Sequence, residues 1–103
     1  MVLKYKVLIF QSAENDLISI LDNIAEISGS VRSVEKWHSK IMRTIVSLGY
    51  MPERYVKFDF DPRYRLAKVG KYAVFYRVDK EKMRVLVLRI IYARKNLKEA
   101  LEE

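Results

Sequence analysis

The sequence contains no cysteine, and this absence excludes several kinds of chemistry. Without thiols the chain can form no disulfide, no zinc–thiolate site and no cysteine nucleophile. The absence also fits the reducing cytoplasm, where we expect the protein to act. One histidine, His38, and the lack of acidic pairs at metal-ligand spacing argue against a metal site. We therefore expect neither a metal nor another cofactor.

Long hydrophobic runs are also missing. No stretch approaches the roughly 20 uncharged apolar residues that span a bilayer. The first residues lack the apolar run and small-residue cleavage site of a signal peptide, so we expect no membrane partner. The 103 residues are enough for one hydrophobic core but too few for two, which predicts a single domain over residues 1–103.

Glycine and proline are scarce, with three and two residues, so each one marks a boundary between elements. Residues 13–27 and 34–48 each repeat apolar side chains at intervals of three, four and seven, the spacing of one helix face. Ser12 is a suitable N-cap residue for the first run, the second run begins near Ser33, and only a short turn around Gly29 separates the two. We therefore expect two amphipathic helices packed as an antiparallel hairpin.

Four segments rich in β-branched and aromatic residues predict strands: 3–10, 64–69, 72–78 and 84–92. Gly70 stands where a type II′ turn needs glycine, and segment 84–92 is apolar on both faces, which predicts a central strand. Residues 49–62 are expected to be irregular, and residues 96–101 to form a short polar helix. The order β-αα-βββ-α predicts an α+β fold, with the helical hairpin on one face of a mainly antiparallel four-stranded sheet.

The net charge of +7 is the first indication of function. A small domain this basic attracts polyanions or acidic protein surfaces, and such binding weakens with salt. Charge alone does not distinguish a nucleic acid from an acidic protein. A sheet that stacks bases displays aromatic side chains on an open face, and Phe75 is the one clear aromatic residue that we expect on the outward face of the strand hairpin. A basic binding domain therefore stays one open possibility.

Three motifs occur in order along the chain: SAENDL at residues 12–17, VGKYAVFYRV at 69–78 and RIIYAR at 89–94. Together with the expected element order, they resemble the first-helix opening, the strand hairpin and the basic last strand of the RelE/ParE superfamily of type II toxins. The resemblance implies the RelE/ParE fold and the toxin of a plasmid-stabilising toxin–antitoxin module that inhibits bacterial growth. It also implies a cognate antitoxin that neutralises the chain in a hetero-oligomer. A non-toxic basic binding domain stays the alternative.

Members of this superfamily act in two ways. RelE-like toxins cleave mRNA on the ribosome without a metal, and ParE-like toxins poison DNA gyrase. Metal-free cleavage needs a base, an acid and cations that stabilise the charge growing on phosphate. Aligned on Gly70, the cationic positions of RelE-like nucleases fall on Leu66, Lys68 and Ala73, of which only Lys68 is basic. This depletion favours gyrase as the target and leaves the ribosome with its mRNA as the alternative.

A two-residue turn at Gly70 would place Leu66, Lys68, Ala73, Phe75 and Arg77 on one face of the hairpin, with an apolar centre. If the chain is a nuclease, the resemblance implies a reduced catalytic set of Lys68, Tyr92 and Arg94. The candidates for target binding are the basic residues of the hairpin and of the exit from the last strand: Arg65, Lys71, Arg77, Arg94 and Lys95. For Arg65 the alternative is a structural role, paired with Asp59 or Asp61 in the loop.

The antitoxin is expected to fill an apolar groove between the helical hairpin and the sheet edge. The candidate contact residues are Leu21, Ile24, Trp37 and Ile41. For Trp37 the alternative is a core position that anchors the helical hairpin.

Overall fold

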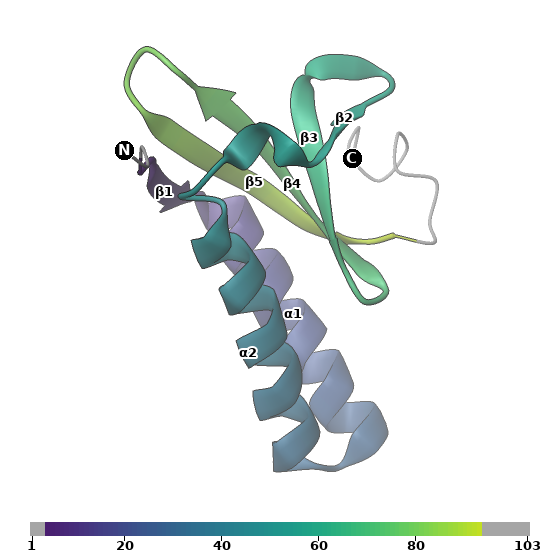
Figure 1. Ribbon diagram of the computed structural model, residues 1–103. Coiled ribbons are helices and arrows are strands. Elements are labelled where there is room, and N and C mark those ends of the chain that lie inside the picture. Colours follow the sequence, from purple (N-terminus) through teal and green to yellow (C-terminus); the bar gives the residue numbers. More distant parts are fainter. Residues whose placement is uncertain (1–3, 94–103) are drawn as a thin grey trace.

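The protein consists of two layers, a five-stranded sheet and a helical hairpin that packs on one of its faces (Figure 1). The computed structural model describes residues 4–93. The elements in chain order are β1 (Lys6–Ile9), α1 (Gln11–Ser28), α2 (Val31–Ser47), a short 3-10 helix (Pro52–Arg54), β2 (Val56–Phe58), β3 (Asp61–Val69), β4 (Tyr72–Asp79) and β5 (Arg84–Tyr92). The predicted helix at residues 96–101 lies outside the described residues. No helix within residues 4–93 is long and apolar enough to cross a membrane.

The α+β class, the helical hairpin and the mainly antiparallel sheet are confirmed. The strand order is β1-β5-β4-β3-β2, and β1 pairs with β5 in parallel while the other neighbours are antiparallel. Strand β5 lies between β1 and β4, as its two apolar faces predict.

The predicted count of four strands was wrong, because the segment expected to be irregular contains β2. This strand has only three residues, too few for an alternating pattern to show in the sequence. It forms because β3, which begins at Asp61 rather than at residue 64, offers a partner, and Val56 lies opposite Leu66. Pairing with a distant strand, rather than local propensity, creates this element.

Both helices begin earlier than the sequence suggests. Helix α1 starts at Gln11 with Phe10 in the N-cap position, and the Ser12 hydroxyl donates instead to the Leu88 carbonyl oxygen, 2.6 Å away on β5. In α2 the cap is Ser30, whose side chain accepts a hydrogen bond from the Ser33 backbone N–H. A tertiary hydrogen bond to the sheet therefore replaces the local cap expected at Ser12.

The strand hairpin has the expected turn and register. Gly70 has φ +60°, and Lys71 has no positive φ, which is the type II′ pattern. Val69 lies opposite Tyr72, Lys68 opposite Ala73 and Leu66 opposite Phe75. The faces of the two strands are thereby fixed.

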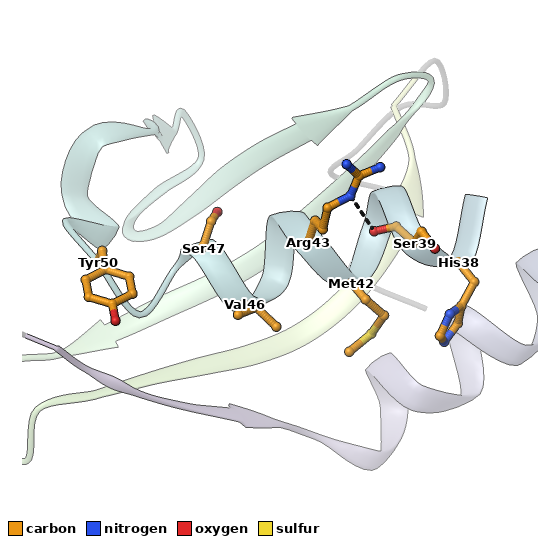
Figure 2. Close-up of a pocket in the computed structure, with 7 residues that line it drawn as sticks. All are labelled: His38, Ser39, Met42, Arg43, Val46, Ser47 and Tyr50. Atoms are coloured by element: carbon orange, nitrogen blue, oxygen red, sulfur yellow. Dashed lines mark hydrogen bonds between the residues drawn. The ribbon is translucent and has the colours of Figure 1, made fainter. Parts of the chain in front are cut away.

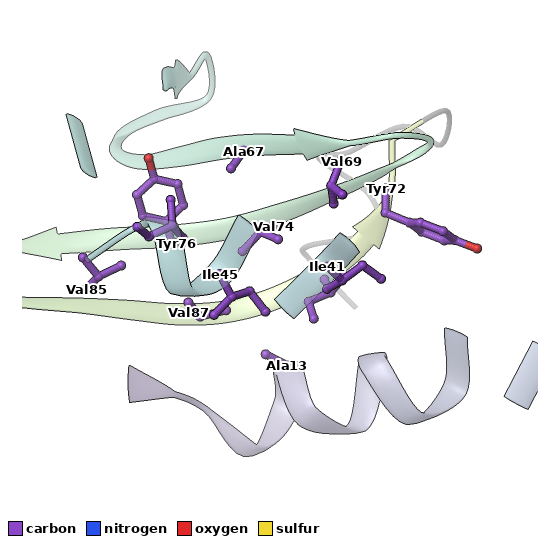
Figure 3. Close-up of a cluster of buried hydrophobic side chains, with 12 residues drawn as sticks. Ala13, Ile41, Ile45, Ala67, Val69, Tyr72, Val74, Tyr76, Val85 and Val87 are labelled. Carbon is purple, nitrogen blue, oxygen red and sulfur yellow. The ribbon is translucent and has the colours of Figure 1, made fainter. Parts of the chain in front are cut away.

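The main core lies between the helices and the sheet (Figure 3). Ile41 and Ile45 of α2 reach toward Val74 and Tyr76 of β4, and all four side chains are at most 1% exposed. The hydroxyl of Tyr76 donates to the Pro52 carbonyl oxygen at 2.5 Å. This bond satisfies the one polar atom of a side chain that is otherwise packed in apolar surroundings.

Candidate functional site

The sheet face that points away from the helices carries a second apolar cluster. Leu66, Ala73 and Phe75 of the hairpin are all buried there, together with Phe58 of β2 and Ile91 of β5. The centre of this outward face is therefore apolar, as the expected register implies. Two of the three positions that are cationic in RelE-like nucleases hold buried, uncharged side chains.

Aromatic residues on this outward face are more numerous than expected. The ring of Tyr64 stacks on Phe75 with centroids 4.7 Å apart, and Phe58 meets Phe75 edge-on at 5.6 Å. Phe58 could not be assigned to this face without β2. Because Phe58 and Phe75 are at most 8% exposed, they form a packed cluster rather than an open surface on which bases could stack.

The two described residues of the reduced catalytic set lie on opposite faces of the sheet. Lys68 is exposed on the outward face, opposite Ala73 in the hairpin register. Tyr92 packs on the helical side, where its ring meets Tyr72 edge-on at 5.9 Å. Arg94 lies outside the described residues. The structure therefore does not bring Lys68 and Tyr92 together as one catalytic centre.

Arg65 has the structural role that was its alternative, but with different partners. Its guanidinium donates to the carbonyl oxygens of Glu53 and Tyr55, at 3.0 and 2.7 Å, and lies 3.6 Å from the Glu53 carboxylate. Asp61, one of the two expected partners, instead binds Arg63 at 2.6 Å. Arg65 thus fastens the loop after α2 to β3.

The remaining candidates for target binding are separated along the hairpin. Arg77 pairs with Tyr64 at the end away from the turn and, with Arg65, lines an open polar cavity of about 420 Å³. Lys71 lies in the turn itself. Lys95 lies, like Arg94, outside the described residues.

The hairpin turn rests on Trp37 of α2. A Cβ at Gly70 would lie 2.6 and 2.8 Å from two atoms of the indole ring, so only glycine fits there. The ring also meets Tyr72 edge-on at 5.3 Å, while the ammonium groups of Lys40 and Lys71 lie 4.9 and 5.8 Å from its centroid. Burial and the neighbouring Tyr92 raise the pKa of Tyr72. Trp37 therefore anchors the hairpin and holds two cations at one end of the molecule.

The four residues expected to contact the antitoxin differ in accessibility. Ile24 and Ile41 are 8% and 0% exposed and belong to the interior. Leu21 and Trp37 are half-buried. Only the latter two present surface to a partner in this conformation.

An apolar groove of about 700 Å³ lies along α2, and the sequence analysis did not identify it (Figure 2). The side chains of Met42 and Val46 point to one side of α2, where Tyr50 also lines the groove. The guanidinium of Arg43 points to the opposite side of the helix. Val46 is 63% exposed and Tyr50 45% exposed. The signal in the sequence is a second line of residues four apart, His38, Met42 and Val46, beside the apolar line that enters the core.

Within residues 4–93 no group of three histidine or acidic side chains is close enough to hold a metal ion. His38, the single histidine, is exposed at one end of the apolar groove. In the segment before β3, Phe58 is buried, whereas Phe60 is 62% exposed.

Known proteins share this architecture. The chromosomal ParDE system of P. aeruginosa matches with a TM-score of 0.77 at 17% identity, over 88% of this chain and 98% of that one. The RelBE2 toxin–antitoxin complex of Mycobacterium tuberculosis matches with a TM-score of 0.62 at 20% identity, over 87% of this chain and 92% of that one. The isolated RelE toxin of E. coli matches with a TM-score of 0.53 at 18% identity, over 95% of this chain and 96% of that one. No curated protein sequence matches the chain.

A helical hairpin on one face of an open, mostly antiparallel sheet, shared with these structures, is the fold of the RelE/ParE superfamily of toxins. The family model described as the ParE toxin of the type II toxin–antitoxin system, parDE, matches residues 7–97. The chain belongs to this ParE toxin family.

Proposed function

We propose that this chain inhibits bacterial growth by poisoning DNA gyrase rather than by cutting mRNA on the ribosome. The observation that carries the proposal is the outward face of the β3–β4 hairpin. Leu66 and Ala73 are buried there, where the RelE-like pattern has cations. Each missing cation removes transition-state stabilisation, at a cost of roughly tenfold or more in cleavage rate.

The separation of Lys68 from Tyr92 supports the same proposal. A general base and a cation that act on one phosphodiester must both reach it within hydrogen-bond distance. Side chains on opposite faces of a sheet do not meet this requirement. Membership of the ParE family rather than of a nuclease family adds to the argument.

We further propose that a cognate antitoxin covers the helical hairpin. The relatives include toxins solved in complex with their antitoxins. Met42, Val46 and Tyr50 provide an apolar surface on α2, in addition to the predicted contact residues Leu21 and Trp37. An amphipathic helix or an extended segment of the antitoxin would bury this surface.

The test is induction of the toxin in bacteria, with growth, the DNA damage response and mRNA cleavage measured in the same cultures. We expect growth arrest, a DNA damage response and intact mRNA, and gyrase trapped on cleaved DNA in a purified reaction. Lys68→Ala and Tyr92→Phe should leave toxicity largely intact. If either change abolished toxicity in a folded protein, and ribosome-bound mRNA were cut by the wild type alone, the nuclease alternative would replace this proposal.

Arg94 and Lys95 are proposed to contact the target, because they follow the last residue of β5 by two and three positions in the sequence and carry charge that can bind an acidic or phosphate-bearing surface. We expect the double change Arg94→Ala with Lys95→Ala to abolish toxicity while the free energy of unfolding changes by less than about 1 kcal/mol. Lys57→Ala with Lys82→Ala, which removes the same charge elsewhere, is the control. Full toxicity of the first variant would show that this exit is not the working surface.

A further inference from the structure

The two helices carry opposite charge. Helix α1 has four carboxylates, Glu14, Asp16, Asp22 and Glu26, and no basic residue. Helix α2 has four cations, Arg32, Lys36, Lys40 and Arg43, and a single carboxylate, Glu35. The positive charge of the helical layer therefore lies on α2 and its negative charge mainly on α1.

Three of these cations lie in one row. Lys36, Lys40 and Arg43 are spaced by four and three residues, so they share one face of the helix over about 10 Å of its length. Lys40 and Arg43 line an open groove of about 340 Å³ whose other wall is Val69 of β3. Figure 2 shows the Arg43 guanidinium on the side of α2 opposite Met42 and Val46. The basic row therefore adjoins the apolar groove, and Arg43 lies at the border between the two.

The strand hairpin adds a fourth cation to this row. Because Gly70 packs against Trp37, the adjacent Lys71 is held with its ammonium 5.8 Å from the indole centroid, and Lys40 lies 4.9 Å from the same centroid. The indole attracts both cations, so α2 and the strand hairpin each place an ammonium group beside the same ring.

None of these cations is neutralised by the part of the chain that the structure describes. The ion pairs within residues 4–93 involve Arg63, Arg65, Lys80, Arg84 and Arg89. Arg43 donates from Nε to the Ser39 carbonyl oxygen, and its two terminal amino groups donate to no described residue. These two groups form the planar fork that binds phosphate oxygens in pairs.

The negative end of the α2 dipole would oppose an anion near Ser47, but a further arginine counters it. Arg54 donates to the carbonyl oxygens of Ser47 and Tyr50 and to the Ser47 hydroxyl. The carbonyl groups at this end of the helix are thereby covered by a positive charge. The end of α2 is consequently less unfavourable to an anion than its dipole alone would make it.

We propose that the groove lined by Lys40 and Arg43, together with Lys36 one turn before Lys40 and Lys71 two residues after Val69, binds the phosphate backbone of duplex DNA without reading its sequence. We call this surface the α2 basic groove (Lys36, Lys40, Arg43 and Lys71). An acidic protein segment would need apolar anchor sites for affinity, and Val69 is the single large apolar residue among the described residues that line the groove. Unpaired cations in a row are what recognition of a phosphate backbone requires. The inference stands apart from the proposed target, although DNA held by gyrase would be a natural ligand.

The test is binding of the full-length toxin, free of antitoxin, to a fluorescent 20-base-pair duplex of arbitrary sequence at several salt concentrations. We expect a Kd of roughly 1 to 100 µM near physiological salt. Lys40→Gln with Arg43→Gln should weaken binding roughly tenfold and reduce the slope of log K against log salt by about 1.8, the value for two lost phosphate contacts. Circular dichroism verifies that the variant is folded.

Lys57→Gln with Lys82→Gln is the matched control, because both residues are exposed and the net charge falls equally. The proposal is overturned if the duplex does not bind at 50 mM salt or if the control loses as much affinity. It is also overturned if polyglutamate of equal charge competes better than the duplex, or if duplex RNA binds much more tightly than DNA. A toxin that poisons gyrase without binding DNA refutes this inference alone, whereas DNA binding without gyrase poisoning refutes the proposed function alone.

Discussion

At the scale of single residues, several cations serve the fold rather than a partner. The guanidinium of Arg54 donates to the carbonyl oxygens of Ser47, Tyr50 and Met51 and lies 4.6 Å from the centroid of the Tyr55 ring. It occupies the acceptors that the end of α2 leaves unpaired. The charge available to a target is therefore smaller than the formal charge of the chain, and it is confined to particular surfaces.

Replacing Gly70 with alanine should destabilise the protein for two reasons. Its φ of +60° is strained for a residue with a Cβ, and that Cβ would lie 2.6 Å from the Trp37 ring. We expect a loss of about 2 to 4 kcal/mol in the free energy of unfolding, from about 1 kcal/mol of backbone strain and 1 to 3 of overpacking. Urea denaturation measures this loss.

Gly29→Ala is the matched control for this prediction. Gly29 has the same φ of +60°, and no atom lies within 4 Å of the added Cβ. It should therefore lose only the backbone contribution of about 1 kcal/mol. Equal losses for the two variants would show that Trp37 does not press against the turn.

The buried hydroxyl of Tyr76 should make stability sensitive to alkaline pH. Burial raises the pKa of Tyr76 from 10.0 to about 12. The folded state therefore holds the proton more tightly than the unfolded state, and this stabilisation is present below pH 10 and lost as the pH rises through 12. A shift of this size corresponds to about 2 to 3 kcal/mol.

Tyr76→Phe isolates the contribution of this one tyrosine. Near pH 8 the variant should be about 1 to 2 kcal/mol less stable, because the Pro52 carbonyl oxygen loses its donor. Between pH 10 and 12 the difference from the wild type should shrink, since only the wild type must ionise a buried phenol at this site. A difference that stays constant in urea titrations across this range contradicts the assignment.

At the scale of elements, α1 takes over the edge of β5 where β1 ends. The pairing of β1 reaches Val87 of β5. Beyond that point Ser12 donates to the Leu88 carbonyl oxygen, and the Asp16 carboxylate accepts from the Ile90 backbone N–H at 2.9 Å and from Arg89 at 2.7 Å. Helix side chains thus satisfy strand groups that would otherwise be left unpaired.

Asp16→Ala should detach α1 from this edge. The Ile90 N–H would lose its acceptor in a half-buried site, so we expect a loss of about 2 kcal/mol in the free energy of unfolding. The midpoint of urea unfolding should fall, and hydrogen exchange of the Ile90 amide should accelerate. Glu14→Ala, an exposed carboxylate in the first turn of the same helix, should cost less than about 0.5 kcal/mol. Unchanged protection of Ile90 in the Asp16 variant would contradict this account.

At the scale of the whole molecule, the excess of positive charge makes the carboxylates important for acid stability. The hydrogen bond from Arg84 lowers the pKa of Asp79, and the hydrogen bond from Arg63 lowers the pKa of Asp61. Groups whose folded pKa is depressed stabilise the fold above their unfolded pKa, near 3.8. This contribution disappears as the pH falls through the folded values.

We therefore expect acid unfolding to begin below about pH 4. Protonation of the carboxylates leaves 20 lysines and arginines with few counter-charges, so repulsion adds to the loss of the ion pairs. Moderate salt should move the midpoint to lower pH by screening this repulsion.

Circular dichroism during acid titration measures this midpoint. The stability of Asp79→Asn should fall less steeply with pH than that of the wild type, because the variant has no carboxylate to protonate at this site. This explanation of acid unfolding would be excluded if salt left the midpoint unchanged and the stability of the two proteins fell equally steeply with pH.

The features that the sequence determined by itself depend on local rules. The apolar spacing of three and four residues predicts α1 and α2, because a helix repeats every 3.6 residues. Gly70 fixes the hairpin turn, and the turn fixes which side chains lie opposite each other. The apolar outward face could therefore be predicted from the order of the residues alone, whereas the argument against a nuclease also needed the resemblance to RelE-like toxins.

Contacts between distant parts of the chain decided the rest. The three residues of β2 become a strand only because β3 lies beside them, and Ser12 leaves its expected cap for an oxygen on β5. Arg65 binds Glu53 rather than Asp59 or Asp61, which are nearer to it in the sequence. The 3-10 helix brings carbonyl groups to Arg65 in space. Sequence spacing carries no information on such contacts, because they are selected by the packed arrangement with the lowest free energy. The α2 basic groove has the same origin, since a helix and a strand hairpin supply its cations and only packing of Gly70 on Trp37 brings them together.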